Sequence, residues 1–349
     1  MPCRRVGNSG LYVSEIGLGL WKWGDPSYDG SRVGDADGFK ILDRALELGV
    51  FHWDTACSYN LGSGNSERLL GRYFASRPST AREEVVLATK IHNPVREERV
   101  MTADFTPNQQ GGSRSYIQYA VEKCLHRLKT DHIDILYLHN PVVNEDGSYR
   151  IPLDETMGAM DDLITQGKVR YLGISNHSTQ QINDATEMMK QVGKDISRRI
   201  TVVQNRYNLL DREEVTCKKG GSANDFLHNT EKSGLGMIPY YPLSSGLLTG
   251  RYRKGKIDSA SGRIIDDKLQ NQFLTESKLN KVEVLIKYAE GKKISVPQLA
   301  IAWLLAHKEI PSAIAGVSTM EQLEDNVKAV KTRLTPEDLN EIDTLLATA

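Results

Sequence analysis

Four side chains that could together donate a proton to an oxygen atom lie far apart in the sequence. Asp54 falls within the apolar run 50–56, and Tyr59 follows it five residues later. Lys90 and His139 come near the ends of two later apolar runs. A tyrosine with a pKa near 10 is a weak acid, and a neighbouring ammonium group lowers that pKa. A carboxylate keeps the ammonium charged and in place, and an imidazole can orient a carbonyl oxygen, so the set predicts a proton-donating centre for an oxyanion.

Each of these side chains also has an ordinary structural explanation. Asp54 could cap the helix that follows it, and Tyr59 could pack within a loop. Lys90 could be a solvated charge, and His139 could be a hydrogen-bonded core residue. The catalytic interpretation therefore depends on the fold bringing all four to one face.

Short apolar runs alternate with longer segments of helical period along the whole chain. Most of the runs are apolar on both faces, which is typical of strands buried in a parallel sheet. The helical segments begin near Ser, Thr or Asp, residues that cap helices well. The predicted strands are 15–20, 50–56, 85–91, 133–140, 169–176, 201–208, 236–243 and 312–318, and the clearest helices are 35–49, 113–131, 153–168, 178–193, 295–307 and 319–331.

The alternation predicts an α/β fold, a TIM-type (β/α)8 barrel, in a single domain over residues 1–349. A doubly wound sheet with a second domain is disfavoured, because composition does not change along the chain and no glycine-rich turn follows the first strand. The GNSG turn at 7–10 predicts an N-terminal β-hairpin that closes the barrel floor. Polar segments 92–115 and 247–280 are predicted as long loops after strands 3 and 7, and such loops are usually functional or disordered.

A barrel would place its active site at the carboxyl ends of the strands. Lone polar residues at such positions often only cap the next helix, so their coincidence at one rim is what favours function. The polar residues predicted at this rim are Asp54, Lys90, His139, Ser175, Asn176, Gln204 and Tyr240.

Composition excludes several classes of function. The 349 residues are 39% hydrophobic and 26% charged with a net charge of -1, so no basic excess indicates nucleic-acid binding. No apolar stretch approaches the roughly 18–20 residues of a membrane helix, and no apolar segment follows the N-terminal arginines as in a secretory signal. The four widely spaced cysteines, Cys3, Cys57, Cys124 and Cys217, predict reduced thiols and a cytoplasmic protein, with a disulfide between distant cysteines as the alternative. The predicted rim has no cluster at metal-ligand spacing, so no metal is expected.

Seven motifs in order make the chain resemble an aldo-keto reductase over nearly its whole length. The branch it resembles includes potassium-channel β-subunits and bacterial glyceraldehyde-phosphate reductases. The resemblance implies that Asp54, Tyr59, Lys90 and His139 are the catalytic residues, with Tyr59 the general acid in reduction and the base in oxidation. The motifs are DTACSY…GSGNSERLLGR (54–72), LATK (87–90), IDILYLHNP (133–141), GKVRYLGISN (167–176), QNRYNLLDR (204–212), PLSSGLLTGRY (242–252) and AGVSTMEQLEDN (315–326).

The resemblance further implies a nicotinamide cofactor that lies extended across the barrel mouth, without a Rossmann domain. Its residues would be Trp21 beside the nicotinamide, Ser175, Asn176 and Gln204 on the carboxamide, Tyr240 stacked under the ring, Tyr241, Pro242, Leu243, Ser244, Gly246 and Arg251 along the phosphates, and Gly316, Ser318, Gln322, Asp325 and Asn326 at the adenosine end.

Two positions depart from the family pattern. Thr319 stands where many members have a basic residue for the adenosine 2′-phosphate, which would lose charge-assisted hydrogen bonds there. Ser318 with the amides at a helix start, Lys328, or a residue from the long loop could bind that phosphate instead. NADP(H) is therefore favoured, with NAD(H) as the alternative. Asn140 is the second departure, and it contacts either the substrate or only the next loop.

The expected function is reversible, NADP(H)-dependent reduction of an aldehyde or ketone, with sugars and sugar phosphates among the candidates. The alternative is a regulatory subunit that holds the cofactor as a redox sensor, although His139 favours the enzyme because the channel subunits carry a different residue there. The expected partner is a small carbonyl or alcohol substrate, and an oligomer is left open. Pocket candidates are Trp21, Trp23, Tyr59, His92 and Asn140, while Arg96, Arg99 and Arg114 could meet a phosphorylated substrate or simply be solvated.

Overall fold

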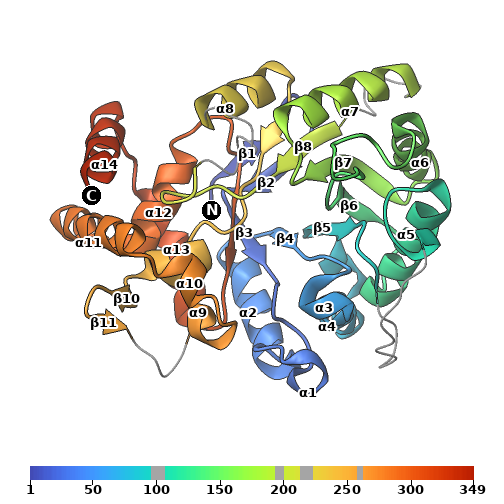
Figure 1. The fold of residues 1–349 in the computed structure, drawn as a ribbon. Coiled ribbons are helices and arrows are strands. Elements are labelled where there is room, and N and C mark those ends of the chain that lie inside the picture. The colour runs from blue at the N-terminus through green and yellow to red at the C-terminus, as the bar shows by residue number, and fades with distance from the viewer. Residues whose placement is uncertain (96–106, 193–199, 213–222, 258–261) are drawn as a thin grey trace.

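A computed structural model describes residues 1–95, 107–192, 200–212, 223–257 and 262–349 (Figure 1). At its centre is a curled, eight-stranded parallel sheet in the order β12-β3-β4-β5-β6-β7-β8-β9. Just after β9 the chain meets the other outer strand, because the backbone N–H of Ile314 in β12 donates to the carbonyl oxygen of Pro239 over 3.1 Å. Each predicted run overlaps one strand: β3 (Ile16–Gly19), β4 (His52–Asp54), β5 (Val86–Ile91), β6 (Ile133–Leu138), β7 (Val169–Ser175), β8 (Ile200–Gln204), β9 (Gly236–Met237) and β12 (Ala313–Gly316).

The strands are shorter than their apolar runs, most clearly in β9. The run 236–243 predicts a strand of eight residues, but β9 ends at Met237. Pro239 and Pro242 have no N–H group to donate to a neighbouring strand, so regular pairing stops. Tyr240 forms only an isolated bridge with Arg206, and it therefore lies beyond the strand rather than within it.

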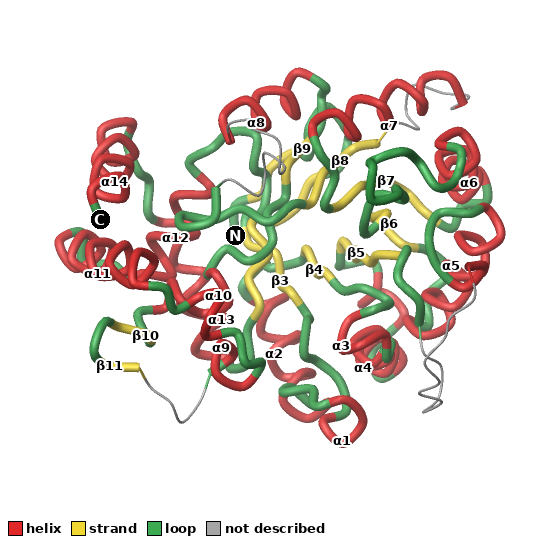
Figure 2. Tube along the Cα trace, in the orientation of Figure 1, coloured by secondary structure: helices red, strands yellow, loops and turns green. Residues whose placement is uncertain are grey.

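Helices surround the sheet (Figures 1 and 2). Each of the six predicted helical segments contains a helix. Side chains of Ser113, Ser295 and Thr319 accept hydrogen bonds from backbone N–H groups in the first turns, as predicted for capping residues. The longer helices are α2 (Asp35–Glu47), α4 (Asn65–Ala75), α5 (Arg114–Leu128), α6 (Leu153–Thr165), α7 (Thr179–Val192), α8 (Ala223–Lys232), α11 (Glu276–Gly291), α12 (Val296–Leu305), α13 (Met320–Lys328) and α14 (Pro336–Thr348).

The predicted N-terminal hairpin is present, with β1 (Cys3–Arg5) antiparallel to β2 (Tyr12–Ser14). Val6, Leu11 and Val13 are buried and pack against side chains of the central strands, including Ile135 and Val202. Val6 and Leu11 flank the turn that joins β1 to β2. Because these side chains pack against the central strands, the hairpin closes one end of the curled sheet.

The segment after β9 is more ordered than its polarity suggests. It contains the 3₁₀ helix η5 (Ser244–Thr249), the antiparallel pair β10 (Tyr252–Arg253) and β11 (Lys256–Ile257), and the short helices α9 (Arg263–Asp266) and α10 (Gln270–Phe273). Tyr252, Ile264 and Phe273 of this segment are buried in the core. The mean hydropathy of the segment does not reveal them, because most of the neighbouring residues are polar. After β5, part of the other predicted loop, residues 96–106, lies outside the described residues.

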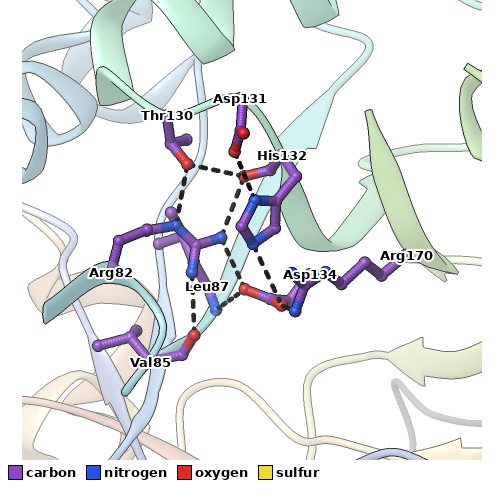
Figure 3. Close-up of polar contacts among 8 residues, drawn as sticks. All are labelled: Arg82, Val85, Leu87, Thr130, Asp131, His132, Asp134 and Arg170. Atoms are coloured by element: carbon purple, nitrogen blue, oxygen red, sulfur yellow. Dashed lines mark hydrogen bonds and ion pairs between the residues drawn. The ribbon is translucent and has the colours of Figure 1, made fainter. Parts of the chain in front are cut away.

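A buried ionic cluster fixes the amino ends of β5 and β6 (Figure 3). The Arg82 guanidinium donates to Asp134 Oδ2 over 2.7 Å and to the carbonyl oxygens of Val85 and His132 over 3.0 Å each. Asp134 Oδ2 also accepts the backbone N–H of Leu87 over 2.9 Å. These contacts lie at the strand ends opposite to those that carry the predicted catalytic residues.

Candidate active site

Three of the four predicted catalytic side chains meet around one ammonium group. Asp54 ends β4, Lys90 lies in β5, and Tyr59 begins the short helix α3 (Tyr59–Gly62). Lys90 Nζ donates to Asp54 Oδ1 over 2.5 Å, to Tyr59 Oη over 2.8 Å and to the Thr55 carbonyl oxygen over 2.8 Å. The Tyr59 hydroxyl in turn donates to Asp54 Oδ1 over 3.0 Å. Gln204 Nε2 donates to the second carboxylate oxygen, Asp54 Oδ2, over 2.8 Å, which fixes the plane of the carboxylate.

His139 follows β6 and lies beside this group. Its backbone N–H donates to the Ile91 carbonyl oxygen over 2.8 Å. Its ring meets the edge of the Tyr59 ring, with 6.3 Å between the two centroids. The structure therefore brings all four predicted catalytic side chains to one end of neighbouring strands.

The Tyr59 hydroxyl is held in its protonated form. Burial raises the pKa of Tyr59 well above its usual value, and the Asp54 carboxylate raises it further. This outweighs the lowering of the pKa that the sequence predicts from Lys90 alone. Burial also lowers the pKa of Lys90, but the Asp54 carboxylate opposes that change. The phenol therefore keeps a proton to donate.

The His139 ring is neutral at ordinary pH. Burial lowers the pKa of His139 well below its usual value, and the positive charge of Lys90 lowers it further. A neutral imidazole has one N–H donor and one acceptor nitrogen. His139 can therefore orient a carbonyl oxygen by a hydrogen bond, without adding a positive charge.

These residues line a cleft with a volume of about 1170 Å³. The cleft extends from the strand ends to the start of α13. The predicted residues on its wall are Trp21, Asp54, Tyr59, Lys90, His139, Ser175, Asn176, Gln204, Tyr240, Tyr241, Pro242, Leu243, Gly246, Arg251, Gly316, Ser318, Gln322, Asp325 and Asn326.

Ser244 is the predicted cofactor residue whose side chain the structure turns elsewhere. Its hydroxyl is buried and donates to Asp211 Oδ2 over 3.0 Å. The neighbouring Ser245 lines the cleft instead, and its buried Oγ has no hydrogen-bond partner. Arg251 lines the same cleft, and an unpartnered hydroxyl and a guanidinium both suit an anionic group, so the cleft wall fits the phosphates of a dinucleotide.

The adenosine end of the cleft is formed by α13 and the strand before it. Thr319 caps α13 through its side chain, and Ser318 donates its backbone N–H to Gln322 Oε1 over 2.7 Å. Asp325 accepts hydrogen bonds from Ser295 Oγ over 2.7 Å and from Gln298 Nε2 over 2.5 Å, which ties α13 to α12. Polar groups at this end of the cleft fit the hydroxyl and amine groups of an adenosine.

Arg263 is a cleft residue that the sequence reasoning missed. Its guanidinium carbon lies 3.9 Å from the centroid of the Trp21 ring and 4.5 Å from that of Tyr241. Trp21 stacks with both Tyr59 and Tyr241, with centroid distances of 5.9 and 5.7 Å. Arg263 lies in the long polar segment 247–280. Loops of that length are often functional, and this is the sequence feature that could have pointed to Arg263.

Two cations that line the cleft link α9 to the loop after β3. Arg32 Nη2 lies 2.9 Å from Asp266 Oδ2, and Lys22 Nζ lies 3.6 Å from Asp267 Oδ1. Neither cation is predicted from the sequence as a site residue. The long segment after β9 is thereby held against the other side of the cleft.

The remaining pocket candidates are distributed more widely. Trp23 is fully buried, with its indole N–H donating to the Val317 carbonyl oxygen over 2.9 Å, so it is a core residue. His92 and Asn140 both contact Asn93, which lines the cleft. Arg114 forms an exposed ion pair with Asp162 on α6. Arg96 and Arg99 lie outside the described residues.

The described residues contain free thiols and neither a metal-binding cluster nor a membrane-spanning helix. Cys3, Cys57 and Cys124 are free thiols there, while Cys217 falls outside it. The same residues include no group of three or more His, Cys, Asp or Glu side chains placed to hold a metal ion. None of the helices in the described ranges combines the length and the apolar character that crossing a membrane requires.

Comparison with known proteins agrees with the motifs. The Aldo/keto reductase family matches residues 15–347. L-glyceraldehyde 3-phosphate reductase of Escherichia coli (strain K12) is 30% identical over 352 residues, which cover 99% of this chain and 93% of that protein. A probable voltage-gated potassium channel subunit beta of Arabidopsis thaliana is 31% identical over 353 residues, 99% of this chain and 97% of that protein. Versiconal hemiacetal acetate reductase of Aspergillus parasiticus is 28% identical over 359 residues, 98% of this chain and 96% of that protein. The chain belongs to the aldo/keto reductase family.

Proposed function

We propose that this protein is an NAD(P)H-dependent oxidoreductase that reversibly reduces an aldehyde or ketone to an alcohol. The observation that carries the proposal is the position of the Tyr59 hydroxyl, 2.8 Å from Lys90 Nζ and 3.0 Å from Asp54 Oδ1 on the wall of the cleft. A protonated phenol beside a buried ammonium can give up its proton as negative charge develops on an oxygen atom.

Each catalytic side chain has a role in this proposal. A nicotinamide, when bound, supplies the hydride for the carbonyl carbon. Tyr59 and His139 donate hydrogen bonds to the carbonyl oxygen, and Tyr59 transfers its proton to that oxygen. Lys90 stabilises the phenolate that remains, and Asp54 keeps Lys90 charged despite its burial. In the oxidation of an alcohol, Tyr59 acts as the base.

We propose NADP(H) as the favoured cofactor, with NAD(H) as the alternative. Asn176 and Tyr240 would hold the nicotinamide, Ser245 and Arg251 the phosphates, and Ser318 at the start of α13 the adenosine side. The amino end of a helix favours a phosphate group, which supports the 2′-phosphate there, whereas the uncharged Thr319 weakens the preference. Titration of the intrinsic fluorescence with each dinucleotide measures the two dissociation constants and decides the preference.

The proposed substrates are small aldehydes and ketones, with sugars and sugar phosphates among them. The E. coli relative is named for the reduction of a phosphorylated aldehyde. Lys22 and Arg32 line the same cleft, where an anionic substituent would compete with their partners Asp267 and Asp266.

A carbonyl panel tests the proposal. Absorbance at the nicotinamide band is followed while the protein is mixed with NADPH or NADH and a series of aldehydes, keto-sugars and sugar phosphates. Turnover with at least one carbonyl is expected. Tight binding of a dinucleotide without turnover of any carbonyl would instead favour a redox-sensing regulatory subunit, as the similarity to a channel subunit would allow.

A further inference from the structure

A series of side-chain hydrogen bonds leads from the loop after β7 to the His139 ring. Asn176 Nδ2 donates to Asn140 Oδ1 over 3.3 Å, and Asn140 Nδ2 donates to Asn93 Oδ1 over 3.3 Å. Asn93 Nδ2 lies 3.4 Å from Ser58 Oγ, and Ser58 Oγ lies 3.4 Å from His139 Nδ1. Each contact is long, but together they connect four loops around the cleft.

The direction of this series is fixed at its start. Asn176 Nδ2 donates to the backbone carbonyl oxygen of His139 over 2.8 Å, and a carbonyl oxygen can only accept. The second hydrogen of the same amide is therefore available to Asn140 Oδ1. Asn140 must then present its NH₂ group to Asn93, and Asn93 must present its NH₂ group to Ser58.

The last link joins Ser58 to one ring nitrogen of His139, Nδ1. Ser58 Oγ accepts from Asn93, and its own hydroxyl hydrogen is free to point to His139 Nδ1. An Nδ1 that accepts a hydrogen bond belongs to the tautomer with hydrogen on Nε2. Nε2–H is then the donor that remains for a carbonyl oxygen in the cleft.

We infer that Ser58 and Asn93 are positioning residues that hold His139 as the Nε2–H tautomer. Neither residue need touch the reacting atoms for this role. The inference rests on the proposed function, since it explains how His139 is kept ready to donate to a carbonyl oxygen. It also gives Asn140 a role, because Asn140 accepts a hydrogen bond from Asn176 and donates one to Asn93.

The substitution Asn93→Asp tests the inference with almost no change of shape. A carboxylate cannot donate, so the Ser58 hydroxyl would turn to donate to it, and Ser58 Oγ would accept from His139 Nδ1. The hydrogen of the ring would move to Nδ1. We expect ¹⁵N-histidine NMR at pH 8, where the ring is neutral, to show Nε2–H in the unsubstituted protein and Nδ1–H in the variant, with the signal assigned by its loss in His139→Asn.

The kinetic expectation follows from the loss of one donor to the oxyanion. Asn93→Asp should lower kcat roughly 100-fold, the effect of removing one such donor, while the dissociation constant of the dinucleotide stays the same. Asn340→Asp, which adds the same charge at an exposed position on α14, is the matched control and should change neither the tautomer nor kcat.

A second variant guards against misfolding of the first. Ser58→Ala removes the donor to Nδ1, so we expect both tautomers to be populated. A ring that stays Nε2–H in both variants, or that is Nδ1–H in the unsubstituted protein, would overturn the inference. The NMR result is independent of turnover, so a protein without activity on any carbonyl would defeat the proposed function while the tautomer still tests the positioning role.

Discussion

At the scale of single residues, the buried pair of Asp54 and Lys90 is the main electrostatic feature of the site. Both side chains are 1% exposed, so neither charge is stabilised by water. Lys90 Nζ has three oxygen partners, and both oxygens of Asp54 accept hydrogen bonds. Complete hydrogen bonding offsets the cost of burying the pair, which would otherwise be several kcal/mol for each ion.

Removing the ammonium alone should therefore destabilise the fold. Lys90→Met leaves the Asp54 carboxylate buried without its counter-charge, and we expect the free energy of unfolding to fall by about 3–5 kcal/mol. Urea unfolding of the variant measures this. The double variant Lys90→Met/Asp54→Asn, which removes both charges, should recover much of the stability but none of the activity. A single variant as stable as the unsubstituted protein would show that the pair is not the buried contact described above.

Some residues of the site can be predicted from the sequence, and others cannot. Asp54 and Lys90 follow from their places at the ends of strongly apolar runs. Asn93 and Arg263 lie in segments without periodic patterning, whose path depends on contacts with other loops. The choice between Ser244 and Ser245 depends on one backbone turn, in which both residues have positive φ angles of 47° and 56°. No spacing rule reveals which of the two hydroxyls faces the cleft.

At the scale of elements, the strand positions could be predicted, but several strand ends could not. Long apolar runs identify buried strands because a parallel sheet buries both faces. Where pairing stops is decided by the neighbouring strand and by residues such as Pro239, as β9 shows. The segment after β9 was predicted to be a loop because its average is polar, although a few buried side chains such as Tyr252 and Phe273 order it.

The N-terminal hairpin provides a test at this scale. Leu11 is buried at the closed end of the sheet, whereas the adjacent Tyr12 is 54% exposed. Leu11→Ala should lower the free energy of unfolding by about 2 kcal/mol, and Tyr12→Ala should change it by less than about 0.5 kcal/mol. Because the cleft is at the other strand ends, kcat should be unchanged in both variants. A loss of activity without a loss of stability in Leu11→Ala would contradict a purely structural role for the hairpin.

At the scale of the whole molecule, the two ends of the curled sheet carry different tasks. The amino ends hold the hairpin and the cluster of Arg82 and Asp134, which are structural contacts (Figure 3). The carboxyl ends hold the cleft and its polar residues. A substitution at the amino ends is therefore expected to change stability, and a substitution at the carboxyl ends to change catalysis. The buried charges of Asp54 and Lys90 are the exception, because their loss should change both.

Buried imidazoles should make the whole fold sensitive to mild acid. Burial lowers the pKa of His52 to about 4 and that of His177 to about 4. The unfolded chain, with histidine pKa values near 6.5, binds protons first, so stability is full above pH 6.5 and is lost as the pH falls toward 4. At pH 5 each group should cost about 2 kcal/mol.

Urea unfolding at pH 7.5 and pH 5 measures this loss. His52→Asn should reduce the difference between the two conditions, while His126→Asn, at an exposed position on α5, is the matched control and should not. Equal pH sensitivity in both variants would contradict the assignment of the acid lability to His52.

The central claim, that Tyr59 provides the proton for the reduction, is tested most directly by single-turnover kinetics. The protein is loaded with reduced dinucleotide, mixed with a carbonyl in a stopped-flow instrument, and compared with Tyr59→Phe, which keeps the ring stacked on Trp21 but has no hydroxyl. We predict that the variant binds the dinucleotide with an unchanged dissociation constant and that its rate of nicotinamide oxidation falls at least about 100-fold, the usual lower range for loss of a general acid. Oxidation in Tyr59→Phe at the rate of the unsubstituted protein would contradict the account.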